Sequence, residues 1–150
     1  MFLKQLNLTN FRNYSVLNLD FDQRPTIFVG NNAAGKSNLL ESIYLLSTTK
    51  SPRVETEDEL IKDEEEFLRV EGILNEPEIE LLVIVNRPTD EVSFRKKVMV
   101  NGISRRAVDF IASVFELFMR TRKKPAILNR QKVEEICQRY WLGDSASTAK

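Results

Sequence analysis

Residues 26–37 read Thr26-Ile27-Phe28-Val29-Gly30-Asn31-Asn32-Ala33-Ala34-Gly35-Lys36-Ser37. The first four are β-branched or aromatic without polar alternation, which predicts a strand buried on both faces. From Lys36 to Leu46 apolar residues recur at helical spacing, so we expect a helix directly after the glycine-bearing loop. The order of strand, loop and helix predicts an α/β fold.

The loop satisfies the pattern G-x-x-x-x-G-K-[ST], which is typical of phosphate-binding loops. Glycines let the backbone turn tightly, so that successive N–H groups face phosphate oxygens, and the helix start adds further unpaired N–H groups. Lys36 would supply a cation to the β- and γ-phosphates, and Ser37 a hydroxyl to Mg²⁺. No Asn-Lys-x-Asp segment, which would read guanine, is present, so ATP with Mg²⁺ is the predicted ligand. The predicted nucleotide-binding residues are Gly30, Asn31, Asn32, Ala33, Ala34, Gly35, Lys36 and Ser37, with Ser37 also the metal ligand.

The rest of the chain predicts a small sheet and further helices. Alternation of apolar and polar residues favours half-exposed strands near 2–8 and 16–21, and a short helical turn is expected around 57–62. Three runs at 67–74, 79–86 and 92–100 resemble an antiparallel meander. Asn101-Gly102 is a strong turn signal, and Ser104 is expected to cap a helix that ends near Phe118. A further helix is expected near 129–142.

Composition excludes several classes of protein. The 150 residues are enough for one domain, and there is no histidine, which excludes histidine-based triads and histidine-containing zinc sites. The single cysteine, Cys137, excludes an internal disulfide framework and fits a reducing compartment. The longest aliphatic run, Leu81 to Val85, is far shorter than the ~20 residues of a membrane span. We therefore expect a cytoplasmic protein that does not contact the membrane.

Equal numbers of basic and acidic residues, 22 of each, hide an uneven distribution. Between Val54 and Phe67 there are eight acidic residues and only one lysine, which predicts a solvated face that repels DNA. Between Arg95 and Lys132 there are eleven basic residues and two acidic ones. Such a cluster is compatible with neutralising DNA phosphates, and equally with an ordinary charged surface.

Several short motifs, in order, resemble the amino-terminal ATPase lobe of the RecF family of DNA replication and repair proteins, which belongs with the SMC-type ATPases. The resemblance covers roughly residues 1–115. It rests on Leu6-x-Leu8-x-Asn10-Phe11-Arg12-Asn13-Tyr14, the loop Gly30–Ser37, Asn38-Leu39-Leu40-Glu41-Ser42-Ile43-Tyr44, Lys50-Ser51-Pro52-Arg53, Glu59-Leu60-Ile61, Arg69-Val70-Glu71-Gly72 and Val98-x-Val100-Asn101-Gly102.

This resemblance implies a P-loop NTPase lobe of the ABC/SMC type, with an antiparallel β flank and carboxy-terminal helices. It implies that Arg12, after the first strand, reaches the bound nucleotide, with Asn13 a weaker candidate, and that Ala33 stands where glycine is common. It also implies nucleotide-dependent DNA binding, a nucleotide-dependent homodimer and recombination-mediator partners. The implied role is in DNA repair, replication and the SOS response to DNA damage.

The sequence departs from the family pattern after about residue 115. Within the 150 residues we find neither an apolar run ending in a Walker B carboxylate nor a Ser-Gly-Gly signature segment. We therefore divide the chain into a RecF-like lobe over 1–115 and an unmatched, helical tail over 116–150, which makes the chain either a truncated form or one whose last third has a different origin. Phosphoryl transfer needs a metal-holding carboxylate, so the expectation is ATP binding with little hydrolysis.

Two other functions fit the same residues. One is a small P-loop kinase in which Arg105 and Arg106 clamp a phosphorylated substrate, and the other is a non-catalytic remnant of an ATPase lobe.

Overall fold

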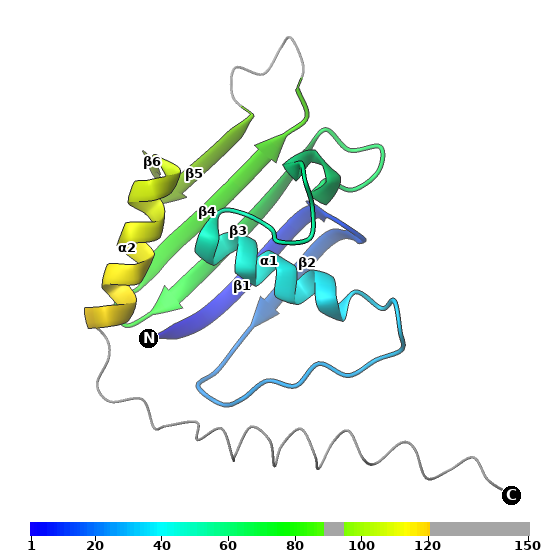
Figure 1. Ribbon diagram of the computed structural model, residues 1–150. Helices are drawn as coiled ribbons and strands as arrows, with labels where there is room; N and C mark the ends of the chain where they lie inside the picture. Colours follow the sequence, from blue (N-terminus) through cyan, green and yellow to red (C-terminus); the bar gives the residue numbers. More distant parts are fainter. Residues whose placement is uncertain (89–94, 121–150) are drawn as a thin grey trace, which may run out of the picture.

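The computed structural model describes residues 1–88 and 95–120, with side chains described through Glu116 (Figure 1). The helix expected near 129–142, Cys137 and most of the predicted tail lie outside these residues. Within them the chain forms one antiparallel sheet with two α-helices.

The sheet of the described residues has six strands in the order β2-β1-β3-β4-β5-β6, and each pair of neighbours is antiparallel. The predicted meander is confirmed, because β3, β4 and β5 are consecutive in the sheet. The strands are β1 (Phe2–Phe11), β2 (Tyr14–Asp20), β3 (Phe67–Asn75), β4 (Ile79–Asn86), β5 (Lys96–Val100) and β6 (Ile103–Arg105).

Alternation along the strands places the core on one face of the sheet. In β1, Leu6 and Leu8 are buried while their neighbours are half-buried, as their spacing predicted. The same period appears in β3, where Leu68 and Val70 are fully buried, and in β4, where Val83 and Val85 are. These side chains form one continuous hydrophobic cluster.

Helix α1 (Lys36–Thr48) and helix α2 (Ala107–Arg120) cover this apolar face (Figure 1). Gly72 allows α1 to approach β3 closely, because a Cβ added there would lie 2.3 Å from Cδ2 of Leu46. Phe110, with no exposed surface, joins α2 to the same core. The predicted short turn is a 3₁₀ helix, η1 (Glu57–Leu60), with Thr56 and Glu59 forming a capping box.

The buried strand predicted at Thr26–Val29 is wrong. These residues form neither strand nor helix, and 55% of Ile27 and 86% of Val29 are exposed. A strand that is buried on both faces needs hydrogen-bonding neighbours and two covering layers. In the described part of the chain every sheet pairing is antiparallel, and none includes this run. Residues 26–29 therefore have a composition that favours a strand, but no strand of the described residues pairs with them.

The prediction that Ser104 caps a helix is also wrong. Ser104 lies in β6, opposite Met99 of β5, and the helix begins at Ala107. Asn101 and Gly102 both have positive φ values, of 50° and 74°, which suit a tight hairpin turn. The turn returns the chain onto β5 before the helix begins.

Candidate nucleotide-binding site

The phosphate loop is built from exposed backbone that ends at a buried glycine. Residues 30–34 are exposed and Gly35 is buried directly before α1. Gly35 has φ of 99° and Ala33 has φ of 65°, both in the left-handed region that favours glycine. The positive φ at Ala33 gives a physical reason for a preference for glycine at this position.

The turn between β1 and β2 packs against the loop. A Cβ added to Gly35 would lie 2.6 Å from Oη of Tyr14 and 2.7 Å from Nδ2 of Asn13, and together with its φ of 99° this contact favours glycine there. Asn38 Nδ2 donates a hydrogen bond to Oδ1 of Asn13 at 2.9 Å. Asn13, predicted as a weaker site residue, thus lies beside the helix that follows the loop.

The N-terminus of α1 is open toward the loop. No side chain caps it, and the N–H groups of its first turn have no acceptors within the helix. Lys36 folds back over the loop, where its Nζ donates to the carbonyl oxygens of Gly30 at 2.5 Å and Asn31 at 2.7 Å. Its ammonium group therefore lies within the loop that the pattern assigns to phosphate.

A cavity of about 350 Å³ opens at this place. Phosphate-loop residues and the adjoining helix start line most of it, and Arg53 adds a guanidinium from the segment after α1. Ser37, the predicted metal ligand, lines it too. The lining residues are Asn32, Ala33, Gly35, Lys36, Ser37, Asn38 and Arg53.

Glu41 of α1 is a buried carboxylate that links two arginines. Its Oε1 accepts hydrogen bonds from Nη2 of Arg12 at 3.0 Å and from Oγ of Ser51 at 2.6 Å. Its Oε2 accepts from Nε of Arg12 at 3.2 Å and from Nη1 of Arg53 at 3.0 Å. Arg12 also donates to the carbonyl oxygen of Glu59 at 3.0 Å, which ties η1 to the same cluster.

These contacts set the charge of Glu41. Burial alone would raise the pKa of its carboxyl group, because it disfavours the charged form. Hydrogen bonds from Arg12 and Ser51 and the positive charges of Arg12 and Arg53 outweigh burial, so the pKa lies below its ordinary value. Glu41 is therefore ionised at neutral pH. Its single negative charge balances one of the two positive charges of Arg12 and Arg53.

Arg12 lies in the tight turn after β1, with φ of 53°. Its guanidinium forms a two-point fork on Glu41 and is not among the groups that line the cavity. Arg53, to which sequence reasoning gave no role, lines the cavity instead. The motif Lys50-Ser51-Pro52-Arg53 was the available signal, since it places a cation shortly after the phosphate-loop helix.

The acidic run and the basic cluster are partly paired with each other. Arg95 forms an ion pair with Asp58, and Lys96 with Glu57. The Arg95 guanidinium lowers the pKa of Asp58 through a hydrogen bond. Arg106, which the kinase alternative assigned with Arg105 to a phosphorylated substrate, pairs with Asp109 of α2 at 2.8 Å. Among the residues whose side chains are described, Arg95, Lys96 and Arg106 of the basic segment therefore already have acidic partners.

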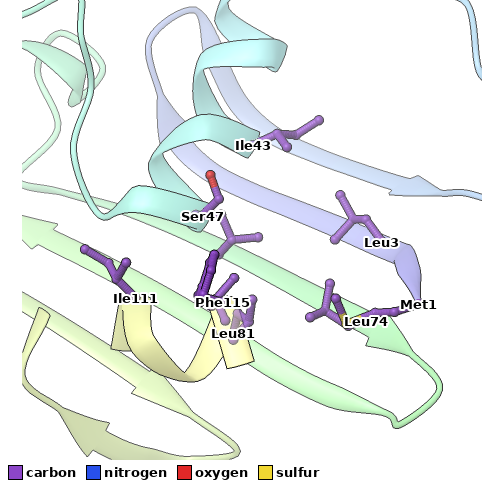
Figure 2. A pocket seen from close by; sticks show the side chains of 10 residues that line it. Met1, Leu3, Ile43, Ser47, Leu74, Leu81, Ile111 and Phe115 are labelled. Carbon is purple, nitrogen blue, oxygen red and sulfur yellow. The ribbon is translucent and has the colours of Figure 1, made fainter. Parts of the chain in front are cut away.

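A second, apolar cavity of about 310 Å³ lies elsewhere, between α1, α2 and the ends of β1, β3 and β4 (Figure 2). Apolar side chains form nearly all of its wall, and Ser47 is its one polar residue, so it offers no chemistry for phosphate. It is lined by Met1, Leu3, Ile43, Leu46, Ser47, Leu74, Leu81, Ile111, Val114 and Phe115.

No helix within residues 1–88 and 95–120 is long and apolar enough to cross a membrane.

Comparison with known proteins identifies the family of the chain. The family described as "AAA ATPase domain" matches residues 1–143. A protein of Oceanobacillus iheyensis named DNA replication and repair protein RecF is 37% identical over 117 residues, and the RecF protein of Acaryochloris marina is 42% identical over 112 residues. These stretches cover 76% and 74% of this chain, and the chain spans only about 30% of either relative's length.

Solved structures show the same lobe. A structure of the recombination mediator protein RecF-ATP in the RecFOR pathway superposes with a TM-score of 0.65 and 32% identity, covering 73% of this chain and 30% of that one. A solved SMC ATPase chain gives a TM-score of 0.68 at 18% identity, with 92% of each chain covered, which shows a shared fold. The predicted fold class, an ABC/SMC-type P-loop lobe with an antiparallel flank, is thus confirmed. The chain belongs to the AAA ATPase domain family, as a RecF-like amino-terminal ATPase lobe.

Proposed function

We propose that this chain binds Mg²⁺·ATP at the phosphate loop. The observation that carries the proposal is the cavity of about 350 Å³ in which Lys36, Ser37 and Arg53 converge beside an uncapped helix N-terminus. Anions bind favourably at such helix ends, because the N–H groups are unpaired and the helix dipole is positive there. The solved RecF-ATP structure adds support from a relative.

Each residue has a proposed part in holding the nucleotide. The backbone of Gly30–Gly35 wraps the phosphates, Lys36 leaves its carbonyl partners to pair with phosphate oxygens, and Ser37 ligates Mg²⁺. The bound metal would neutralise phosphate charge. Arg53 adds a guanidinium from the segment after α1, and Arg12 assists through the cluster on Glu41.

We propose further that the protein acts in DNA repair or replication and binds DNA in a nucleotide-dependent way. Relatives that carry the name DNA replication and repair protein RecF support this role. The same proposal includes a homodimer that forms when nucleotide is bound, and recombination-mediator proteins as binding partners. Within the described residues the ion pairs of Arg95, Lys96 and Arg106 reduce the free positive charge, so a DNA contact by this lobe must draw on other groups.

The Lys36→Ala variant tests nucleotide binding. It removes a charge-assisted contact to phosphate that is worth about 3 kcal/mol, so ATP affinity should fall about 100-fold. The fold should stay intact, because the lost contacts lie in an exposed loop. The measurement is calorimetric titration with Mg²⁺·ATP, together with circular dichroism.

The matched control is Lys4→Ala, which removes an exposed lysine of β1 that pairs with Glu78. Its ATP affinity should equal that of the parent chain. Retained ATP binding in Lys36→Ala would reject the site. Repeating the titration with DNA present, and measuring phosphate release, separates a DNA-coupled ATPase from a remnant that binds ATP only.

A further inference from the structure

Arg53 owes its position to one carboxylate. Its side chain is 49% exposed, and its Nη1 donates to Oε2 of Glu41 at 3.0 Å and to Oδ1 of Asn38 at 3.2 Å. Its Nε and Nη2 have no hydrogen-bond partner in the part of the chain that the structure describes. One nitrogen of the guanidinium is therefore fixed to the protein, while two donor nitrogens, Nε and Nη2, remain for a ligand in the cavity that Arg53 lines.

Glu41 is itself held rigidly. Its side chain is 1% exposed, and Arg12 and Ser51 together donate three hydrogen bonds to its two oxygens. Arg53 takes the fourth acceptor position. Glu41 lies on α1, five residues after Lys36. A carboxylate that is fixed in this way holds Arg53 at a defined position relative to the helix that follows the phosphate loop.

We propose that Glu41 is a positioning residue for nucleotide binding, which holds the Arg53 guanidinium at the phosphate-loop cavity with two donors directed to phosphate oxygens. The proposal rests on the nucleotide site proposed above and adds to it a residue that touches no nucleotide. Arg12 serves here as the group that orients the carboxylate.

The charge of Glu41 makes the proposal sharply testable. A carboxylate close to a bound triphosphate repels it, so removing the negative charge would by itself tighten ATP binding. Loss of positioning would weaken ATP binding, because an Arg53 side chain that is not held in place loses conformational entropy when it contacts phosphate. The sign of the change in affinity therefore distinguishes the two roles.

The first experiment compares Glu41→Gln with Glu78→Gln in calorimetric titrations with Mg²⁺·ATP. Glu78 is an exposed partner of Lys4, so its substitution makes the same change in net charge without contact to the cavity. We expect Glu41→Gln to weaken ATP binding about tenfold, the loss of one charge-assisted hydrogen bond, and Glu78→Gln to leave it within about twofold. Unchanged or tighter binding by Glu41→Gln overturns the proposal.

A double-mutant cycle separates positioning from a general structural role. In the Arg53→Ala background, Glu41→Gln should no longer weaken ATP binding, because the group through which Glu41 acts is gone and only the removal of its negative charge remains. A tenfold loss in both backgrounds shows that Glu41 acts on the fold and overturns the proposal. Circular dichroism and urea unfolding confirm that each variant is folded under the titration conditions.

The same data keep the two proposals apart. If the parent chain binds no ATP, or if Lys36→Ala binds it normally, the nucleotide site itself is rejected and the role of Glu41 with it. If the parent chain binds ATP through Lys36 but the cycle shows no coupling between Glu41 and Arg53, only the positioning role is rejected.

Discussion

Glu41 makes the stability of the protein depend on pH. Its pKa is lower in the folded chain than in the unfolded chain, so its contribution is present above the unfolded value of about 4.3 and is lost as the pH falls through the folded pKa. We expect the parent chain to be about 2 kcal/mol more stable than Glu41→Gln at pH 7. This difference should narrow steadily below pH of about 4.3.

Urea unfolding of both chains between pH 7 and pH 3 measures this difference. Asp58 and Asp109 also have lowered pKa values, through hydrogen bonds from Arg95 and Arg106, and destabilise both chains equally in acid. Their contributions cancel when the two unfolding free energies are subtracted. A difference that stays constant down to pH 3 would show that the charge of Glu41 does not stabilise the fold.

The positions of the residues in the proposed site were predictable to different degrees. The phosphate loop is a local pattern, so Lys36 and Ser37 could be assigned from the sequence and lie together in the structure. Glu41, Arg12 and Arg53 converge from three segments, and no spacing rule relates them. Arg12 was identified only through family resemblance, and the structure places its guanidinium on Glu41.

Elements were predictable where local pattern and long-range pairing agree. The meander of β3, β4 and β5 and the helix α1 follow from periodicity, because their partners are adjacent in the sequence or lie beneath them in the core. Thr26–Val29 has the composition of a strand, yet hydrogen-bonding neighbours determine whether a strand forms. At Ser104 the Asn-Gly turn outweighed a cap signal, since it pairs β6 with β5.

Because residues 26–29 are exposed and β4 is buried, the same Val→Thr substitution should change the free energy of unfolding by different amounts at the two places. Val29→Thr exchanges a methyl group for a hydroxyl group at a side chain that is 86% exposed, so the free energy of unfolding should change by less than about 0.5 kcal/mol. Val83→Thr places the same hydroxyl group in β4, where the residue has no exposed surface, and should cost about 1–3 kcal/mol. Urea unfolding of both variants measures the effects. Equal losses of stability would mean that residues 26–29 are packed as tightly as β4.

In the molecule as a whole, the proposed ligand site and the core share one helix. The first turn of α1 faces the phosphate-loop cavity, while Leu39, Leu45 and Leu46 of the same helix are buried against the sheet. Unfolding of the core therefore dismantles the site, and nucleotide that binds only the folded chain must stabilise all of it. At a free ATP concentration of 100 times Kd this linkage amounts to about 2.7 kcal/mol.

For a chain of this length, that free energy corresponds to a rise in Tm of roughly 5–10 °C. Thermal unfolding followed by circular dichroism, with Mg²⁺·ATP and with Mg²⁺·AMP at equal concentration, measures it. AMP lacks the β- and γ-phosphates that Lys36 is proposed to contact, so its shift should be much smaller. Lys36→Ala should show a shift of only about 1–2 °C with ATP, because its affinity is about 100-fold lower and the same ATP concentration then contributes only about 0.4 kcal/mol. An equal shift with ATP and AMP would place the ligand away from the phosphate loop, since only contacts to the outer phosphates distinguish the two nucleotides.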